Sequence, residues 1–266
     1  MLSDFDMITH AFPSDITIYP IADVHLGALE FARKEWEAFV QRVESSPNTY
    51  LILAGDLLNN TTRSCRFANP LGDDIMRPRE AKRVMVEYLT PIRDRLLCCV
   101  SGNHERRTIK DSDQDLCLDI MDALGVGHLY RENLAFLRLQ LGQRPSEKKP
   151  NSTYIFTVAH GASNGALTGA AVNSAEAFAS MIDGGLDCFV SGHVHKGFVT
   201  KPAKICIDAR NGAVSMRHYT VLSCVSWLNY GGYAAQRLLR PAYTSDPQII
   251  FLRAGSHGYK KCVTQW

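Results

Sequence analysis

Short apolar runs of strand length recur along this chain and alternate with stretches of helical periodicity. Five such runs, rich in Ile, Val, Leu, Tyr and Cys, lie at 16–21, 50–53, 96–100, 154–158 and 188–190. Continuous apolar runs of this kind are typical of strands that are buried on both faces of a sheet. Because strands that alternate with helices build α/β folds, this rhythm indicates the α/β class.

Two stretches between these strands have the spacing of amphipathic helices. Trp36, Phe39, Val40 and Val43 recur at helical intervals, which places their side chains on one face. A second stretch, 79–89, follows a proline, and proline is favoured in the first turn of a helix. We therefore expect two helices that cover a sheet.

The character of the chain changes after Lys201. The segments 204–208, 213–227 and 248–253 have the pattern of antiparallel strands separated by Gly, Asn and Pro turns, which predicts a second sheet. The polar stretch 142–152 is predicted to be a mobile hairpin loop. We see no linker or repeat, and we expect one domain that spans 1–266.

The composition is that of a globular chain. With 266 residues, 45% of them hydrophobic, the protein can bury a core, and a net charge of +2 is too small to establish a polyanionic partner. No uncharged apolar run reaches the about 18 residues that span a bilayer. Asp4 and Asp6 lie where a secretory signal would be positive. We expect a cytoplasmic protein without a membrane partner.

The cysteines favour a reduced chain. Cys98, Cys99, Cys188 and Cys206 lie inside strand-like runs, where cysteine behaves as a small hydrophobic residue. No Cys-x-x-Cys pair is present among the eight cysteines, which argues against a thiolate zinc site. Metal binding would therefore have to use His, Asp and Asn.

Polar residues that can bind metals follow the ends of all five predicted strands. The blocks are Asp23-Val24-His25, Gly55-Asp56, Gly102-Asn103-His104-Glu105, His160-Gly161 and Gly192-His193-Val194-His195. Ligands bind at the carboxyl ends of strands in α/β sheets, so these blocks should converge in space. One Asp-x-His or His-x-His is weak evidence of a site, but five blocks in order are specific. The glycines permit tight turns that bring the backbone close to an ion.

The types of donor in these blocks indicate which metals fit. Carboxylate, imidazole and one amide oxygen together suit Mn, Fe or Zn better than Mg or Ca, which prefer shells of oxygen only. A single ion would not need so many ligands, whereas a pair of ions about 3.5 to 4 Å apart would, with one carboxylate shared between them. Asp56 is the natural shared ligand.

The series of blocks resembles the calcineurin-like metallophosphoesterase superfamily. The resemblance implies a two-sheet β-sandwich flanked by helices, which agrees with the strand pattern, and two divalent metal ions, with Mn favoured and Fe or Zn possible. By this resemblance the first ion would be held by Asp23, His25, Asp56 and His195. The second ion would be held by Asp56, Asn103, His160 and His193.

The same resemblance implies a mechanism. Two cations lower the pKa of a bridging water, which makes hydroxide available for in-line attack on a phosphate ester. The cations also neutralise charge on the non-bridging oxygens. His104 resembles the family histidine that faces the leaving group, and we assign it as the general acid or as a stabiliser of the transition state. Glu105 is expected to orient its loop.

Two blocks favour different substrates. The segment 21–27, Ile-Ala-Asp-Val-His-Leu-Gly, resembles the SbcD-type DNA-repair nuclease branch, which favours a phosphodiesterase or nuclease acting on nucleic acid or nucleotides. The Asn-His-Glu block is instead similar to the Ser/Thr protein phosphatases. Those phosphatases carry an aspartate that orients the proton-donating histidine, and this chain has Asn59-Asn60-Thr61 there. A phosphomonoesterase is the alternative, and an inactive metal-binding scaffold is a third possibility.

Three further features have open interpretations. The segment 61–83 and Arg106 with Arg107 could contact substrate or could be a solvated surface. Tyr230 to Tyr233, beside Trp227, could stack on a nucleobase, although a glycine-kinked turn is the commoner role of such a sequence. The oligomeric state is open.

Overall fold

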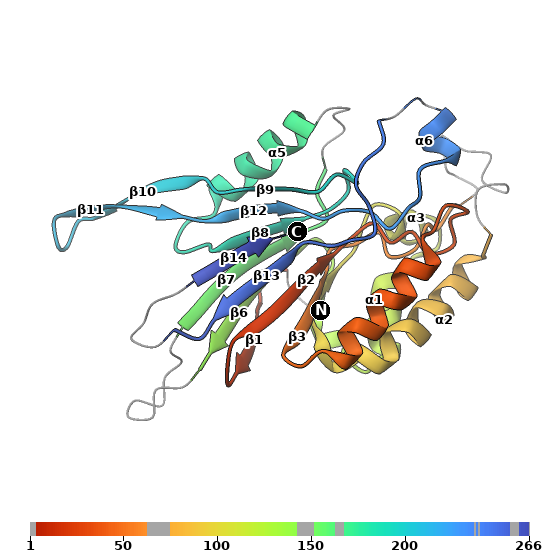
Figure 1. The fold of residues 1–266 in the computed structure, drawn as a ribbon, viewed down its shortest axis with the longest axis horizontal. Coiled ribbons are helices and arrows are strands. Elements are labelled where there is room, and N and C mark those ends of the chain that lie inside the picture. Colours follow the sequence, from red (N-terminus) through yellow and green to blue (C-terminus); the bar gives the residue numbers. More distant parts are fainter. Residues whose placement is uncertain are drawn as a thin grey trace.

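Two mixed β-sheets form the centre of the computed structural model, which describes residues 4–62, 75–142, 152–162, 168–236, 238, 240–255 and 261–265. The first six-stranded sheet has the order β14 (Lys261–Gln265), β13 (Ile249–Arg253), β2 (Ile16–Ile21), β3 (Thr49–Leu53), β4 (Leu96–Val100) and β5 (Tyr130–Arg131). The second has the order β1 (Met7–Phe12), β6 (Leu134–Leu141), β7 (Ser152–Ala159), β8 (Cys188–Ser191), β12 (Thr220–Ser223) and β9 (Phe198–Thr200). Figure 1 shows the two sheets packed as a sandwich.

The five strands predicted from their apolar runs are confirmed as β2, β3, β4, β7 and β8. In the first sheet, β2 pairs with β3 and β3 pairs with β4, both in parallel. In the second sheet, β7 pairs with β8 in parallel. The carboxyl ends of these strands therefore lie at one edge of their respective sheets, which is where the polar blocks begin.

Helices cover both outer faces of the sandwich (Figure 1). They are α1 (Arg33–Ser45), α2 (Pro78–Leu89), α3 (Glu105–Ser112), α4 (Leu116–Ala123), α5 (Thr168–Met181) and α6 (Gly232–Gln236), with the 3₁₀ helices η1 (Thr90–Arg95) and η2 (Gly127–Leu129). The two predicted helices are confirmed as α1 and α2, and α1 buries the four predicted side chains. Helix α4 contacts β4, and α5 lies on β8 and β12. The predicted α/β sandwich flanked by helices is therefore confirmed.

One large apolar core joins the two sheets. It contains side chains of the first sheet, such as Ile18 and Ile52, and of the second, such as Leu137 and Phe156. A smaller core lies between α5 and the second sheet. Within the described ranges, no helix combines the length and the apolar character needed to cross a bilayer.

The strands predicted after Lys201 are present, but the prediction that they form one second sheet was wrong. The segment 213–227 holds two strands, β11 (Ala213–His218) and β12, and β12 joins β8 in the second sheet. Strand β13 pairs with β2 in the first sheet. Strands carry no local signal for their partners, so antiparallel spacing alone could not assign them to a sheet.

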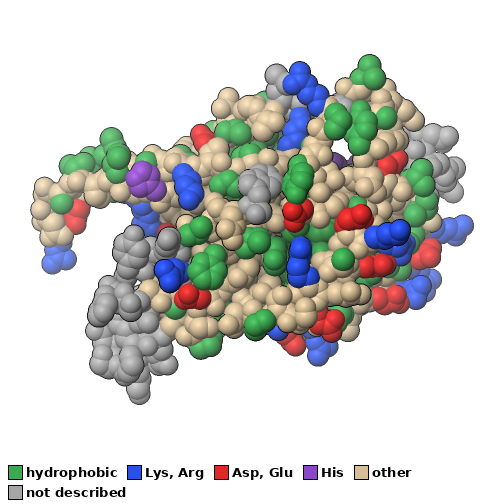
Figure 2. Space-filling model, viewed as in Figure 1, with side chains coloured by type: hydrophobic (Ala, Val, Ile, Leu, Met, Phe, Trp, Pro, Cys, Tyr) green, Lys and Arg blue, Asp and Glu red, His purple; other side chains and the backbone are tan. Residues whose placement is uncertain are grey.

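A two-stranded arm projects from the sandwich. It pairs β10 (Ala203–Asp208) with β11, and Figure 1 shows it extending away from the body. Hydrophobic side chains stand on its surface in Figure 2, where Ile205, Ile207, Val214 and Met216 are exposed. The loop predicted at 142–152 lies mostly outside the described residues, but its flanking strands β6 and β7 do pair antiparallel.

Candidate metal centre

The five polar blocks converge at the edge where the two sheets meet. Asp23 and His25 follow β2, Asp56 follows β3, and Asn103 with His104 follows β4. His160 follows β7, and His193 with His195 follows β8. Backbone hydrogen bonds join neighbouring loops, including Asp23 N to Gly55 O at 3.0 Å and Gly192 N to His160 O at 2.9 Å. All eight predicted site residues therefore belong to one cluster.

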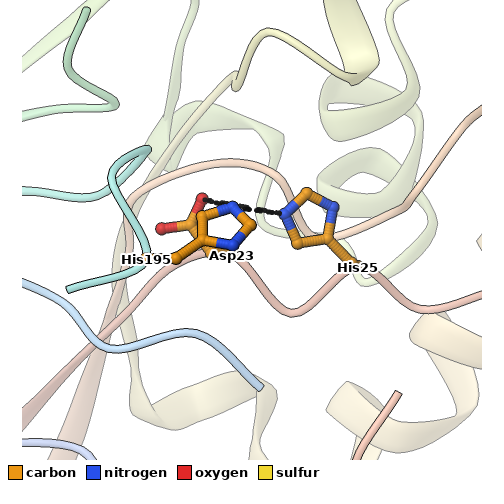
Figure 3. Close-up of side chains that lie close together, drawn as sticks. All are labelled: Asp23, His25 and His195. Atoms are coloured by element: carbon orange, nitrogen blue, oxygen red, sulfur yellow. Dashed lines mark hydrogen bonds and ion pairs between the residues drawn. The ribbon is translucent and has the colours of Figure 1, made fainter. Parts of the chain in front are cut away.

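The first group of donors contains Asp23, His25 and His195 (Figure 3). The Nε2 atoms of His25 and His195 are 3.1 Å apart. Oδ1 of Asp23 is 3.8 Å from Nε2 of His25 and 3.5 Å from Nε2 of His195. The three side chains thus direct one oxygen and two nitrogens at the same small volume.

The second group contains Asp56, His160 and His193, with Asn103 between the two imidazoles. The Asn103 Oδ1 atom is 3.0 Å from His160 Nε2 and 2.6 Å from His193 Nδ1. Oδ2 of Asp56 is 3.2 Å from His160 Nε2. The other ring nitrogen of His160 is 2.8 Å from the Ala54 carbonyl, which can only accept, so Nδ1 carries the proton and Nε2 is left to bind a cation.

Asp56 lies between the two groups. Its Oδ2 atom is 3.8 Å from His25 Nε2 in the first group and 3.2 Å from His160 Nε2 in the second. Its Oδ1 atom accepts a hydrogen bond of 2.8 Å from the His104 backbone N–H, which fixes the orientation of the carboxylate. Asp56 is therefore the one described carboxylate that can serve both groups.

The backbone at these residues is held in an uncommon conformation. Asp23, His25, Asp56, His193 and His195 all have a left-handed φ, between 50° and 73°. Residues with side chains rarely adopt this region, and such strain clusters at functional sites because the surrounding structure must enforce it. The enforced backbone turns each side chain from its strand toward the shared volume.

A glycine makes room for the shared aspartate. A Cβ on Gly102 would lie 2.0 Å from Oδ1 of Asp56 and 2.2 Å from its backbone N. No side chain larger than hydrogen fits at that distance. The sequence predicted that this glycine brings the backbone close to an ion, and the structure shows that it makes room for the Asp56 carboxylate.

The cluster is buried, and its polar atoms lack the positive charge that bound cations would supply. Asp23 is fully buried and its Oδ1 atom has no hydrogen-bond partner. Burial raises the pKa of Asp23 to about 8. Burial also holds the pKa of His25 well below its usual range and lowers that of His195 to about 4, so both imidazoles keep a free lone pair. Burial alone would raise the pKa of Asp56, but His104, His160 and His25 hold it well below the usual range.

These observations fit the binding of divalent cations by the cluster. An orphaned buried carboxylate oxygen facing neutral imidazoles is costly without a positive charge, and a bound cation removes that cost. The mixture of carboxylate, imidazole and amide oxygen matches the preference of Mn, Fe and Zn. The side chains present could therefore hold metal ions.

His104 is placed at the mouth of the cluster. Its Nδ1 atom is hydrogen-bonded to the backbone carbonyl of Asn59, and since a carbonyl can only accept, Nδ1 carries the proton. Its Nε2 atom faces Oδ2 of Asp56 at 3.9 Å and accepts a hydrogen bond of 2.9 Å from Nη2 of Arg107. The main chain thus supplies the orienting group that the sequence comparison could not find at Asn59.

Glu105 ties two of the loops together. Its carboxylate accepts hydrogen bonds from the backbone N–H groups of Asp56 (3.1 Å), Gly102 (3.0 Å) and Leu58 (2.9 Å). The expectation that Glu105 orients its loop is confirmed. Sequence reasoning missed Asn60, which is buried and donates 2.7 Å to the His104 carbonyl.

Of the other candidate residues, some contact the cluster and others do not. Arg107 reaches the cluster through His104, whereas Arg106 donates to the Ser101 and Glu132 carbonyls instead. Trp227 is fully buried and its ring packs edge-on against Trp36, so the ring does not stack on a ligand. Its backbone N–H donates to the Asp23 carbonyl at 3.0 Å. Residues 63–74 of the basic segment lie outside the described part of the chain.

Buried carboxylates and imidazoles at the meeting edge of the two sheets thus form a site that could hold metal ions. The sequence profile of the calcineurin-like phosphoesterase family matches residues 16–197, and the chain belongs to that family. It is a metal-dependent phosphoesterase, and its substrate is a phosphate ester. A metallophosphoesterase from Sphaerobacter thermophilus is a similar solved structure, with 14% identity and a TM-score of 0.38 over 89% of this chain and 83% of that chain. No curated protein sequence matches.

Proposed function

We propose that the chain, acting as one domain over 1–266, is a phosphodiesterase or nuclease that uses two divalent cations. Asp23, His25 and His195 would hold the first ion, and Asn103, His160 and His193 the second, with Asp56 shared. The core that joins both sheets supports the single domain. The observation that carries the two-metal proposal is Asp56, whose Oδ2 atom faces imidazoles of both groups.

The donors support three candidate cations, because imidazole and carboxylate ligands bind Mn, Fe and Zn. We propose manganese first, with iron or zinc acceptable. When bound, the cations supply an acidified water and neutralise negative charge on the phosphoryl group. The chain itself contributes a buried site whose carboxylates are fixed by backbone N–H groups before any substrate arrives.

His104 would handle the proton of the leaving oxygen. With the proton on Nδ1 committed to the Asn59 carbonyl, Nε2 is the nitrogen that faces the site. When the Arg107 guanidinium turns from Nε2 to the substrate, Nε2 can take up a proton and donate it to a leaving oxygen or stabilise the developing charge. Arg107 lies 2.9 Å from this nitrogen and is positioned to bind a non-bridging phosphate oxygen.

A preference for diesters is supported by the segment 21–27 and by the absence of the phosphatase aspartate near Asn59. One observation favours the monoesterase alternative. The Arg107 guanidinium beside His104 could pair with the second negative charge of a monoester. A direct comparison of substrates separates the two functions.

The test combines metal content with turnover. We expect the wild-type protein loaded with Mn²⁺ to bind about two ions per chain and to hydrolyse bis(4-nitrophenyl) phosphate with a higher kcat/KM than 4-nitrophenyl phosphate. Asp56→Asn should lose at least one ion by mass spectrometry and lower kcat at least about 100-fold. Asp94→Asn changes an exposed carboxylate and should change neither.

Two outcomes would contradict the proposal. Unchanged metal content in Asp56→Asn would remove the shared-ligand assignment. Turnover of the monoester with no cleavage of the diester, DNA, RNA or cyclic nucleotides would replace the diesterase with a phosphomonoesterase.

A further inference from the structure

A cavity of about 260 Å³ adjoins the candidate metal centre. His160, Gly161 and Gly192 line it, and His160 also belongs to the second group of donors. His160 is thus common to the cavity and to the candidate metal centre. Its volume lies just below the roughly 300 Å³ at which pockets for whole drug-sized ligands begin, so it suits one ring system.

Both aromatic rings and small side chains line the cavity. Phe178, Phe189 and Phe198 contribute rings, and the centroids of Phe178 and Phe189 are 5.3 Å apart. Helix α5 contributes Ala171 and Ala175, one turn apart on the same face. Phe178 lies on the same helix, so α5 supplies both small side chains and a ring, and a flat ligand ring can fit beside the small side chains.

The cavity is not lined by apolar groups alone. Arg106 and Ser223 both line it. Arg106 Nε and Ser223 Oγ are buried and have no hydrogen-bond partner in the described structure. The Arg106 Nη2 atom makes only long bonds, of 3.4 and 3.3 Å, to two carbonyls. Because both residues line the cavity, a polar occupant could pair with these donors, whereas a purely apolar occupant would leave them unpaired.

We propose that this cavity, the base pocket, binds the nucleobase of the nucleotide whose phosphate lies at the metal centre. The inference rests on the proposed phosphodiesterase function. A nucleobase is flat, stacks on phenyl rings and carries carbonyl and ring-nitrogen acceptors for Arg106 and Ser223. A base held in a stack within a duplex cannot enter such a pocket, so the substrate is a nucleotide ester or an unpaired strand.

The test uses two diesters with the same leaving group. Thymidine 5′-(4-nitrophenyl phosphate) carries a base on the retained side, and methyl 4-nitrophenyl phosphate carries none. We expect the wild-type kcat/KM for the thymidine ester to exceed that for the methyl ester about 10-fold or more, as expected for one stacked base. The ratio cancels any effect on the site that both substrates share.

Ala175→Phe fills the base pocket and should bring this ratio close to one. Ala177→Phe places the same side chain on the exposed side of α5 and should leave the ratio unchanged. Phe178→Ala removes one wall and should lower the ratio, which provides a second variant if Ala175→Phe does not fold. Thermal unfolding of each variant establishes that it is folded.

A wild-type ratio near one, or a high ratio retained in folded Ala175→Phe, would overturn the base pocket. If the wild-type protein cleaves neither ester, the phosphodiesterase proposal fails instead. Calorimetric titration with thymidine 5′-monophosphate and with methyl phosphate then decides the pocket by itself. Tighter binding of the nucleotide that is lost in Ala175→Phe supports the base pocket, and equal binding of both refutes it.

Discussion

Replacing Glu105 with glutamine tests whether this carboxylate holds the metal-binding loops. The glutamine carbonyl can take the place of Oε2 and still accept from Asp56 N and Gly102 N, which lie 3.1 and 3.0 Å from it. The amide NH₂ then faces the Leu58 N–H, which loses its 2.9 Å bond. One buried donor left unpaired costs about 1 to 3 kcal/mol, and two bonds weaken because their acceptor is no longer charged.

The energetic cost is partly offset. Burial raises the pKa of Glu105 to about 7, because a charged carboxylate is unfavourable away from water. The neutral amide of glutamine avoids this cost. We expect a net destabilisation of about 2 to 4 kcal/mol. At roughly 2 to 4 °C per kcal/mol for a domain of this size, Tm should fall by about 5 to 15 °C.

The assay is thermal unfolding followed by circular dichroism, in EDTA so that bound cations do not contribute to stability. Glu35→Gln is the control, because Glu35 also lies in the first turn of a helix but is exposed. It should change stability by no more than about 0.5 kcal/mol. If Glu105→Gln unfolds within 1 or 2 °C of Glu35→Gln, about the shift of so small a change, the carboxylate does not hold the loops as argued.

Three other substitutions give distinct outcomes. Asn59→Ala should keep kcat within about twofold because the backbone carbonyl, not the side chain, pairs with His104; a loss approaching that of a missing orienting group, about 10-fold or more, would contradict this. Arg107→Ala should raise KM about 10-fold, since one charge-assisted contact to phosphate is lost, and an unchanged KM would place the guanidinium outside the substrate site. Gly102→Ala should destabilise the protein by about 1 to 3 kcal/mol and reduce metal content, because its Cβ would overlap the shared aspartate. Gly169→Ala, with open space around its Cβ, is the matched control, and equal effects of the two changes would refute the steric argument.

The local pattern of the chain was sufficient for the central strands and for two helices. Buried parallel strands are continuous apolar runs, and β2 and β4 have the bounds that these runs predicted. Strand β6 was missed although Leu134–Leu141 alternates between buried and more exposed side chains, which is a strand signal. The pairing of β12 and β13 with different sheets could not be read from their own residues.

The sequence by itself determined which residues could bind metal and that they follow strand ends. Their order along the chain and the family match leave the class of chemistry settled at the level of a metal-dependent phosphoesterase. A carboxylate or imidazole at a strand end can be predicted from the sequence because residue type and strand periodicity are local properties.

Only the tertiary structure decided how these residues face one another. The position of Asp56 between two groups, the support of Glu105 and the carbonyl of Asn59 behind His104 each join segments about 30 or more residues apart. The base pocket likewise needs α5 against β8 and Arg106 of α3. Such contacts depend on the packing of two sheets and on an enforced left-handed backbone, and neither leaves a trace in the local pattern of residues.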